Sequence, residues 1–158
     1  MLSSLRARGV DLAYLTLHTG VSSLEVESET LEAHTLYPEP FAVPAGTAGR
    51  LNRARAEGRR VIAVGTTVVR ALESAWTGKR FTASRGFTGR YVYPGHCAHP
   101  FDGLLTGLHN PGASHLAMLY AAAGEDLVRS GYREAVKEGY LWHEFGDAQL
   151  LLTPDLSS

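Results

Sequence analysis

The sequence predicts an α/β fold, with a layered and largely parallel sheet flanked by helices. Two observations predict this class. Strand patterns alternate with helix patterns along the chain, which is typical of layered α/β proteins. In addition, the apolar run Val61–Val64 passes through Gly65 and two threonines directly into a helix pattern. The 158 residues, 44% of them hydrophobic and 20% charged, suffice for one ordinary core. We therefore expect a single α/β domain over residues 1–158.

Glycines and prolines divide the first part of the chain into elements. An amphipathic helix is predicted over Leu2–Arg8, where a glycine ends it, and Val10–Leu17 is a candidate strand. Residues 22–30 are acidic and predict a loop. Residues 35–44 contain three prolines, which predict extended or irregular chain. Apolar residues recur on one side of Thr47–Glu57, so we expect a helix there, ended by the next glycine.

The middle of the chain carries the strongest pattern. Val61–Val64 is entirely apolar, and we expect an interior strand buried on both faces. The helix Thr67–Trp76 should pack across the sheet, because Val69, Leu72 and Trp76 form one apolar stripe.

Shorter elements follow in the second half. Aromatic residues, threonine and glycine in Phe81–Tyr93 indicate strand and turn. The apolar pair Leu104-Leu105 follows a turn. Ser114 can cap a helix that runs to about Ala123, and Glu125–Lys137 forms a last helix before a glycine. Gln149–Leu152 is a closing strand.

Charge and cysteine content limit the classes of function. The formal net charge of −1 gives no global case for nucleic-acid binding. A local patch could still form at the arginines, although arginines around a helix end are usually only solvated; they are Arg53, Arg55, Arg59 and Arg60.

Cys97, the only cysteine, precludes a disulfide within the chain and favours a cytoplasmic protein. It lies between His96 and His99, but no second ligand cluster has metal spacing, so we expect no metal. No apolar run is long enough to span a membrane, and the first residues do not form a signal peptide.

The start of the helix after Gly65 is suited to an anion. Backbone N–H groups are unpaired at a helix N-terminus, and the helix dipole favours negative charge there. Arg70 near this start is explained either by a bound anion or by a surface pair with Glu73, three residues on. A well-capped helix with such a pair is the simpler interpretation.

Other polar residues each have a functional and a structural interpretation. His18 follows a strand, where ligands collect in α/β proteins, or it only caps a turn. His34 and Glu39 flank a proline-rich loop and could form a structural pair. Asp102 and Asp147 adjoin glycines and are turn residues by default. His109 precedes Asn-Pro-Gly and is harder to explain as a core residue. No serine-hydrolase, P-loop or dinucleotide motif is present.

Taken together, several segments resemble the S-adenosylmethionine:tRNA ribosyltransferase-isomerase family of queuosine biosynthesis. Short motifs in a fixed order and spacing are more specific than any single one. The matching segments are Leu15–Gly20, His34 and Glu39, Thr47-Ala48, Leu51-Asn52, Val61–Thr67, Arg70, Leu72–Ser74, Tyr93–Gly95, Asp102–Thr106, His109, Pro111 and Phe145–Ala148.

The resemblance implies a reaction and its ligands. Such enzymes transfer the ribosyl group of S-adenosylmethionine to 7-aminomethyl-7-deazaguanine in tRNA, isomerise the sugar to an epoxycyclopentane-diol, and release adenine and methionine. S-adenosylmethionine is consumed as a substrate, and no metal is implied. Histidines and carboxylates at strand ends could supply the proton transfers.

The resemblance and the residue patterns together nominate the site residues. The expected catalytic residues are His18, Asp102 and His109. The expected substrate-binding residues are Gly20, His34, Glu39, Gly65, Thr66, Thr67, Arg70, Glu73 and Asp147. We expect His18, Gly65, Thr66, Thr67, Arg70, Asp102 and His109 to converge on one cleft.

The chain also departs from the family pattern. Family proteins are about twice as long and include a β-barrel domain, so these residues correspond to the C-terminal half, as a fragment or a shortened relative. Tyr37 stands where a histidine is usual, Val68 where a serine is usual, and Gly107-Leu108 where asparagine and phenylalanine are usual. The family lysine is replaced by Gly112, which removes one point charge for an anion.

These departures leave other functions open. The expected activity is transfer to tRNA, with tRNA bound only if the other half is present and the 158 residues inactive alone. A relative acting on a small molecule, or a nucleoside-binding domain without catalysis, are the alternatives. We expect a monomer in the cytoplasm, without contact to a membrane.

Overall fold

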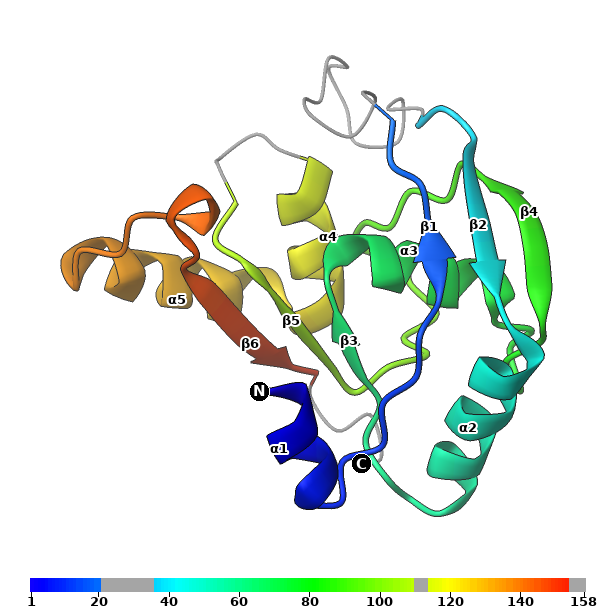
Figure 1. Cartoon of the computed structure of the whole chain (residues 1–158). Coiled ribbons are helices and arrows are strands. Elements are labelled where there is room, and N and C mark those ends of the chain that lie inside the picture. The colour runs from blue at the N-terminus through cyan, green and yellow to red at the C-terminus, as the bar shows by residue number, and fades with distance from the viewer. Residues whose placement is uncertain (21–35, 110–113, 154–158) are drawn as a thin grey trace.

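The computed structural model describes residues 1–20, 36–109 and 114–153, and it has a mixed α/β architecture (Figure 1). In these residues, strands form two three-stranded sheets. The first sheet contains β1 (Thr16–Leu17), β2 (Glu39–Val43) and β4 (Ser84–Thr88), with β2 in the middle and both pairs antiparallel. The predictions for residues 22–30 and for His34 lie outside the described residues.

The second sheet contains the strand of the strong strand-turn-helix pattern that begins at Val61. It contains β3 (Ile62–Val64), β5 (Gly103–Gly107) and β6 (Ala148–Leu152), in the order β3-β5-β6. The pair β3–β5 is parallel, with Ile62 opposite Gly103, and the pair β5–β6 is antiparallel. The expected largely parallel sheet is therefore wrong, since within the described ranges only this pair is parallel.

The reason for that difference is visible in the connections. The helix α2 (Ala45–Ala56) leads from β2 to β3, and α3 (Thr66–Ala75) leads from β3 to β4. Both helices thus join strands of different sheets. Alternation of strands and helices in a sequence does not tell whether a helix returns the chain to the same sheet.

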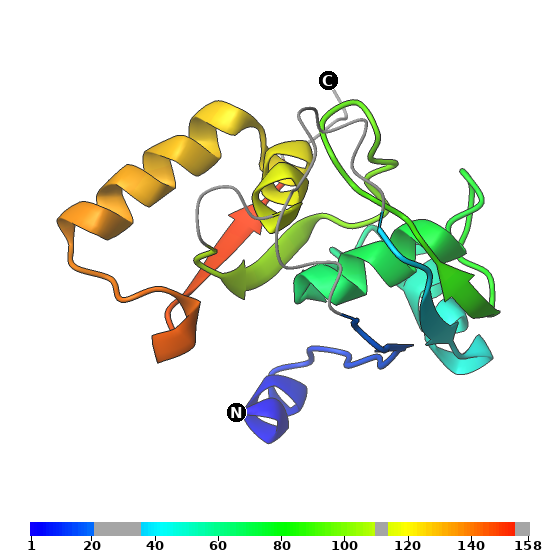
Figure 2. The same cartoon turned by 90° about the horizontal axis from the view of Figure 1, so that it is seen from above.

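Helix α3 lies at the centre of the molecule, where it contacts strands of both sheets. Val69 and Leu72 on α3 are almost completely buried, as the predicted stripe requires. Helices α4 (Ser114–Ala123) and α5 (Glu125–Lys137) pack on each other and agree with their predicted bounds. Seen from above, α5 lies at the end of the molecule opposite β4 (Figure 2).

The remaining elements are short or shifted by one or two residues. Helix α1 (Leu2–Ala7) buries none of its residues. The predicted strand Val10–Leu17 is reduced to the two residues of β1. A short 3₁₀ helix, η2 (His143–Phe145), precedes β6. None of the helices in the described part of the chain combines the length and apolarity needed to cross a membrane.

The expected interior position of β3 is wrong. It pairs with β5 only and forms the edge of its sheet in the described residues. Ala63 is buried, but its neighbours Ile62 and Val64 are 40% and 63% exposed. The strand is apolar on both faces, but in the described residues only the face that carries Ala63 is covered.

Candidate active site

The start of α3 is built by a tight turn at the end of β3. Gly65 has φ 95°, a conformation that favours glycine, and its N–H donates to Leu105 O of the neighbouring strand at 2.8 Å. No side chain caps the helix N-terminus, because glycine has none to offer. Val68 N donates to Gly65 O at 3.1 Å, whereas the N–H groups of Thr66 and Thr67 form no such bond in the described residues and can meet a ligand.

A small cavity opens at this helix start. Its polar lining comes from four segments of the chain. Helix α3 contributes Thr66, Thr67 and Arg70, and the other three segments contribute Thr19, Tyr91 and His115. The enclosed volume is about 20 Å³, enough for roughly one water molecule. The structure thus brings three of the predicted binding residues, Thr66, Thr67 and Arg70, to one place.

Arg70 is buried and its charge is balanced within the protein. Its Nη1 forms an ion pair with Glu39 of β2, and its Nε donates to Arg90 O at 3.0 Å. The other carboxylate oxygen of Glu39 accepts a hydrogen bond from Gly20 N. The predicted surface pair of Arg70 with Glu73 is therefore wrong, since the partner is a residue 31 positions away. Gly20 and Glu39 do join the predicted group, as positioning residues of Arg70.

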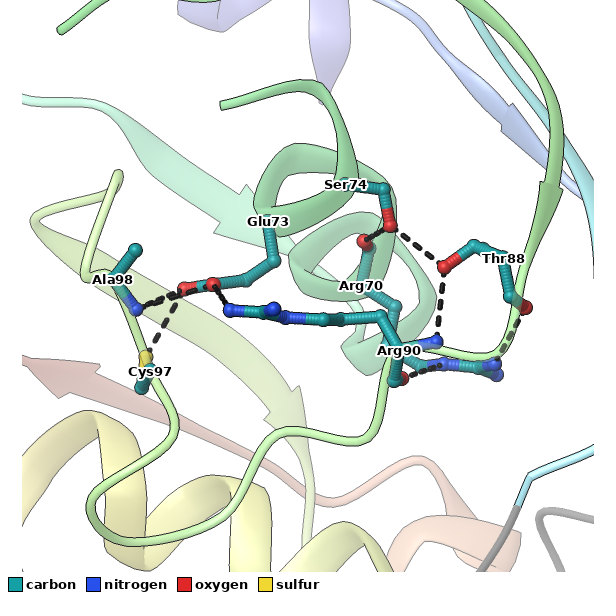
Figure 3. A network of polar contacts seen from close by, with 7 residues as sticks. All are labelled: Arg70, Glu73, Ser74, Thr88, Arg90, Cys97 and Ala98. Atoms are coloured by element: carbon teal, nitrogen blue, oxygen red, sulfur yellow. Dashed lines mark hydrogen bonds and ion pairs between the residues drawn. The ribbon is translucent and has the colours of Figure 1, made fainter. Parts of the chain in front are cut away.

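Glu73 points to the other side of the helix and ties down the segment 90–98 (Figure 3). Its carboxylate accepts hydrogen bonds from Ala98 N at 2.9 Å and from Cys97 Sγ at 3.2 Å. It also pairs with Arg90 at 3.1 Å. Burial first, and then the Glu73 charge, raise the pKa of the Cys97 thiol to about 12. Glu73 lies outside the cavity lining, and its contacts within the described residues are structural.

The same network fastens β4 to α3. Ser74 Oγ donates to Arg70 O and contacts Thr88 Oγ1, both at 2.7 Å. Arg90 N donates to Thr88 Oγ1 at 3.0 Å. The guanidinium of Arg70 also donates to Thr88 O of β4 at 3.5 Å, so that two strands and a loop hold it (Figure 3).

Three histidines gather at the carboxyl end of β5. The ring of His109 stacks on His115, with centroids 4.5 Å apart, and lies 5.2 Å from the ring of His143. Thr106 Oγ1 is 2.9 Å from His109 Nε2. Burial, followed by the neighbouring His115 and His143, lowers the pKa of His109 to about 4. Burial also lowers the pKa of His115. His109 is therefore a neutral imidazole near pH 7.

Access of His143 to this cluster depends on a glycine in β5. A Cβ atom placed on Gly107 would lie 2.3 Å from His143 Cβ, which is an impossible contact. The chain before β6 is further held by His143 N, which donates to Leu108 O at 3.2 Å. Gly107 is thus needed for the close approach of η2 to β5.

Asp102 does not join this site. It precedes β5, at the strand end opposite His109, and its Oδ2 accepts a hydrogen bond from Val61 N at 2.7 Å. There it lines a separate open cleft of about 430 Å³. The expected convergence of Asp102 with the other residues is wrong, because five residues of strand separate it from the histidines.

The remaining predicted residues have simple surroundings. Asp147 accepts a hydrogen bond from Leu141 N and closes the turn before β6, which is the default role given to it. The side chain of His18 is exposed, and the backbone N–H of this residue donates to Pro40 O at 2.9 Å. His18 therefore adjoins Thr19 of the cavity without lining it. Among the described residues, no cluster of three or more His, Cys, Asp or Glu side chains could hold a metal ion.

Sequence reasoning missed the contributions of α4 and of the segment after β4. His115 and Tyr91 both line the cavity. A histidine in the first turn of an apolar helix, six positions after His109, is a signal that could have found His115. Nothing in the local pattern around Tyr91 points to the cavity.

Comparison with known proteins decides the family. The sequence model of the family described as Queuosine biosynthesis protein matches residues 1–151. The chain belongs to this family. It is 41% identical over 154 residues to the S-adenosylmethionine:tRNA ribosyltransferase-isomerase of Halothermothrix orenii, and 42% identical over 153 residues to that of Thermus thermophilus.

The structural comparison agrees with the family assignment. The crystal structure of S-adenosylmethionine tRNA ribosyltransferase from Thermotoga maritima matches with a TM-score of 0.78 and 34% identity, covering 96% of this chain and 48% of that one. The chain spans 45% of the Halothermothrix relative and 44% of the Thermus relative. It is thus similar to somewhat less than half of these proteins.

Proposed function

We propose that the chain serves the queuosine pathway, as a part of the site that transfers and isomerises the ribosyl group of S-adenosylmethionine onto 7-aminomethyl-7-deazaguanine in tRNA. Family membership supports the reaction class, because the relatives carry the name of this activity. We further propose that these residues correspond to the C-terminal half of the family and that they do not complete the transfer alone. The share of the relatives that the chain spans supports this limit.

The observation that carries the proposal is the cavity at the uncapped start of α3. The backbone N–H groups and hydroxyls of Thr66 and Thr67 meet there, beside Arg70, whose guanidinium is held by Glu39. Such a group of donors suits a carboxylate. Since pockets for whole small ligands measure roughly 300–1,000 Å³, a cavity of about 20 Å³ suits only one end of the substrate. We assign it to the methionine carboxylate of S-adenosylmethionine.

The histidines supply the second half of the argument. His109 is neutral near pH 7, so it can accept a proton, and its ring stacks on His115, which lines the cavity. A neutral imidazole beside the substrate site is suited to the proton transfers of ribosyl transfer and isomerisation. We therefore propose His109 as the acid or base of the reaction and keep His18, at the cavity edge, as a second candidate. Asp102, Glu73 and Asp147 are not part of this proposal.

Isothermal calorimetry with S-adenosylmethionine tests the binding step. We expect the chain to bind the ligand weakly and Thr67→Val to weaken binding several-fold, because the variant removes one donor while keeping the side-chain size. Thr82→Val is the matched control, since Thr82 bonds to Ala75 O away from the cavity. The proposal fails if the folded chain binds no S-adenosylmethionine, or if both variants weaken binding equally.

A labelled-ribose transfer assay on tRNA carrying the modified base tests the limit of activity. We expect no transfer by the 158 residues alone. Robust transfer would contradict the proposed dependence on the rest of the family protein. In a second assay the chain is mixed with a full-length relative that has been inactivated by mutation in the matching region. If the chain binds S-adenosylmethionine but the mixture transfers no ribose, a nucleoside-binding domain without catalysis is favoured instead.

A further inference from the structure

The open cleft that contains Asp102 lies apart from the cavity at the start of α3, and the proposed function does not use it. It measures about 430 Å³ and lies at the amino ends of β3 and β5. Its charged lining consists of Arg55, Arg59, Arg60 and Asp102. The volume falls within the range of sites that hold a nucleotide-sized group.

The charges in the cleft are unbalanced. Three arginines and one aspartate line the cleft, and Asp102 already accepts a hydrogen bond from Val61 N at 2.7 Å. Arg59 pairs with Glu57 at 2.9 Å, but both side chains are about half exposed, so water and salt weaken this pair. The cleft is therefore positive in a chain whose formal net charge is −1.

The backbone beneath these arginines is held in place. Arg59 N donates to Ala54 O at 2.8 Å, which closes the end of α2. The carboxylate of Asp102 then fixes Val61 N at the start of the next strand. Arg55 is restrained as well, because its guanidinium lies 4.9 Å from the ring centroid of Trp76. Arginines on a fixed backbone lose less freedom on binding an anion than arginines on a loose loop.

We propose that this cleft binds the phosphate backbone of an RNA. Arginine forks match phosphate oxygens in a bidentate manner, and such contacts supply most of the affinity of proteins for nucleic acids. The five residues of β5 place the cleft about 17 Å from the histidine cluster. A polynucleotide can contact both places at once, whereas a small anion cannot. The inference rests on the proposed function only for the identity of this RNA as tRNA.

Salt-dependent binding tests the cleft directly. The variant Arg59→Gln with Arg60→Gln removes two positive charges from the cleft. Its matched control, Arg85→Gln with Arg133→Gln, removes two from exposed positions on β4 and α5. Affinity for a labelled anticodon stem-loop RNA is measured by fluorescence anisotropy at several salt concentrations. We expect the slope of log K against log salt, which is negative, to become smaller in magnitude by about 2 in the cleft variant and to stay unchanged in the control.

The outcomes separate this inference from the proposed function. Equal slopes for the two double variants, or no salt-dependent RNA binding by the unaltered chain, would overturn the cleft as an RNA site. Calorimetry with S-adenosylmethionine on the same proteins reports on the other end of β5. If the cleft variant loses RNA binding but the unaltered chain binds no S-adenosylmethionine, the cleft is supported as an RNA site and the proposed function is refuted.

Discussion

The two faces of the β3-β5-β6 sheet carry the same kind of side chain and meet opposite surroundings. Leu104 is 0% exposed, and its neighbour Leu105 on the other face is 36% exposed. In β6, Leu151 is 8% exposed and Leu150 is 56% exposed. Successive side chains of a strand point to opposite faces, so each pair compares a covered and an open position with identical chemistry.

The difference shows what an apolar run can tell. Apolar residues on both faces are typical of strands that are covered on both sides. Here only the face toward α3 and α4 is covered in the described residues. The pattern therefore reports that a face is apolar, and it does not report what lies against that face.

The largest loss of stability is expected at the buried ion pair of Arg70 with Glu39. Arg70→Met leaves the carboxylate of Glu39 buried without its partner. We expect the free energy of unfolding to fall by about 3–5 kcal/mol, measured by urea denaturation. The control Arg85→Met alters an exposed arginine and should change it by about 0.5 kcal/mol or less. A similar loss in both variants would show that the buried ion pair does not stabilise the fold.

The paired leucines test the comparison itself. Leu104→Ala should cost about 2–5 kcal/mol of unfolding free energy, because it creates a cavity under α3. Leu105→Ala, one residue along on the open face, should cost clearly less. Chemical denaturation of both variants measures the difference. If the two losses are equal, the open face is covered in solution and the contrast disappears.

The pH dependence of stability sharpens the description of the covered side. Thr106 is buried on the same face as Leu104 and contacts His109, whose pKa is lowered from 6.5 to about 4. Between these values the unfolded chain binds a proton that the folded chain does not bind. The contribution of His109 is therefore complete above pH 6.5 and is lost as the pH falls toward 4.

The variant His109→Gln isolates this contribution from that of the carboxylates. We expect urea midpoints measured between pH 4 and pH 7 to fall less steeply in the variant than in the unaltered chain. The effect should be smaller than those of the two preceding variants, because the ring is partly exposed and solvent screens it. Parallel curves would mean that His109 has an ordinary pKa.

The smallest effect is expected at the edge strand. Val64 is 63% exposed, so Val64→Thr should change the free energy of unfolding by about 0.5 kcal/mol or less. Ala63→Leu, at the adjacent covered position, should cost about 1–3 kcal/mol through overpacking. A marked loss for Val64→Thr in thermal unfolding would contradict the open position of this side chain.

Much of the fold was predictable from local patterns. Helices α4 and α5 have nearly the predicted bounds, since Gly124 separates them and Gly139 follows the second. The strand directions and sheet order were not predictable, because they depend on which strands meet after α2 and α3 cross between sheets. The edge position of β3 was missed for the same reason.

The site was predictable in part. The turn at Gly65 and the two threonines follow from the strand-to-helix pattern, and the structure places them at a cavity. The pairing of Arg70 with Glu39 joins residues 31 positions apart, which no helical spacing indicates. Asp102 shows the opposite case, because it was expected in the same cleft as His109 and lies at the other end of β5, where it holds the backbone of the adjacent strand.

The missing side chain of Gly107 restricts how this sequence can change. Any residue other than glycine there would overlap His143, whose Cβ lies 2.3 Å from the position of a Cβ at 107. A different side chain at 143 would not relieve this contact, because every residue other than glycine also carries a Cβ. A single substitution at position 107 of β5 would therefore displace His143 and with it one member of the three-histidine cluster.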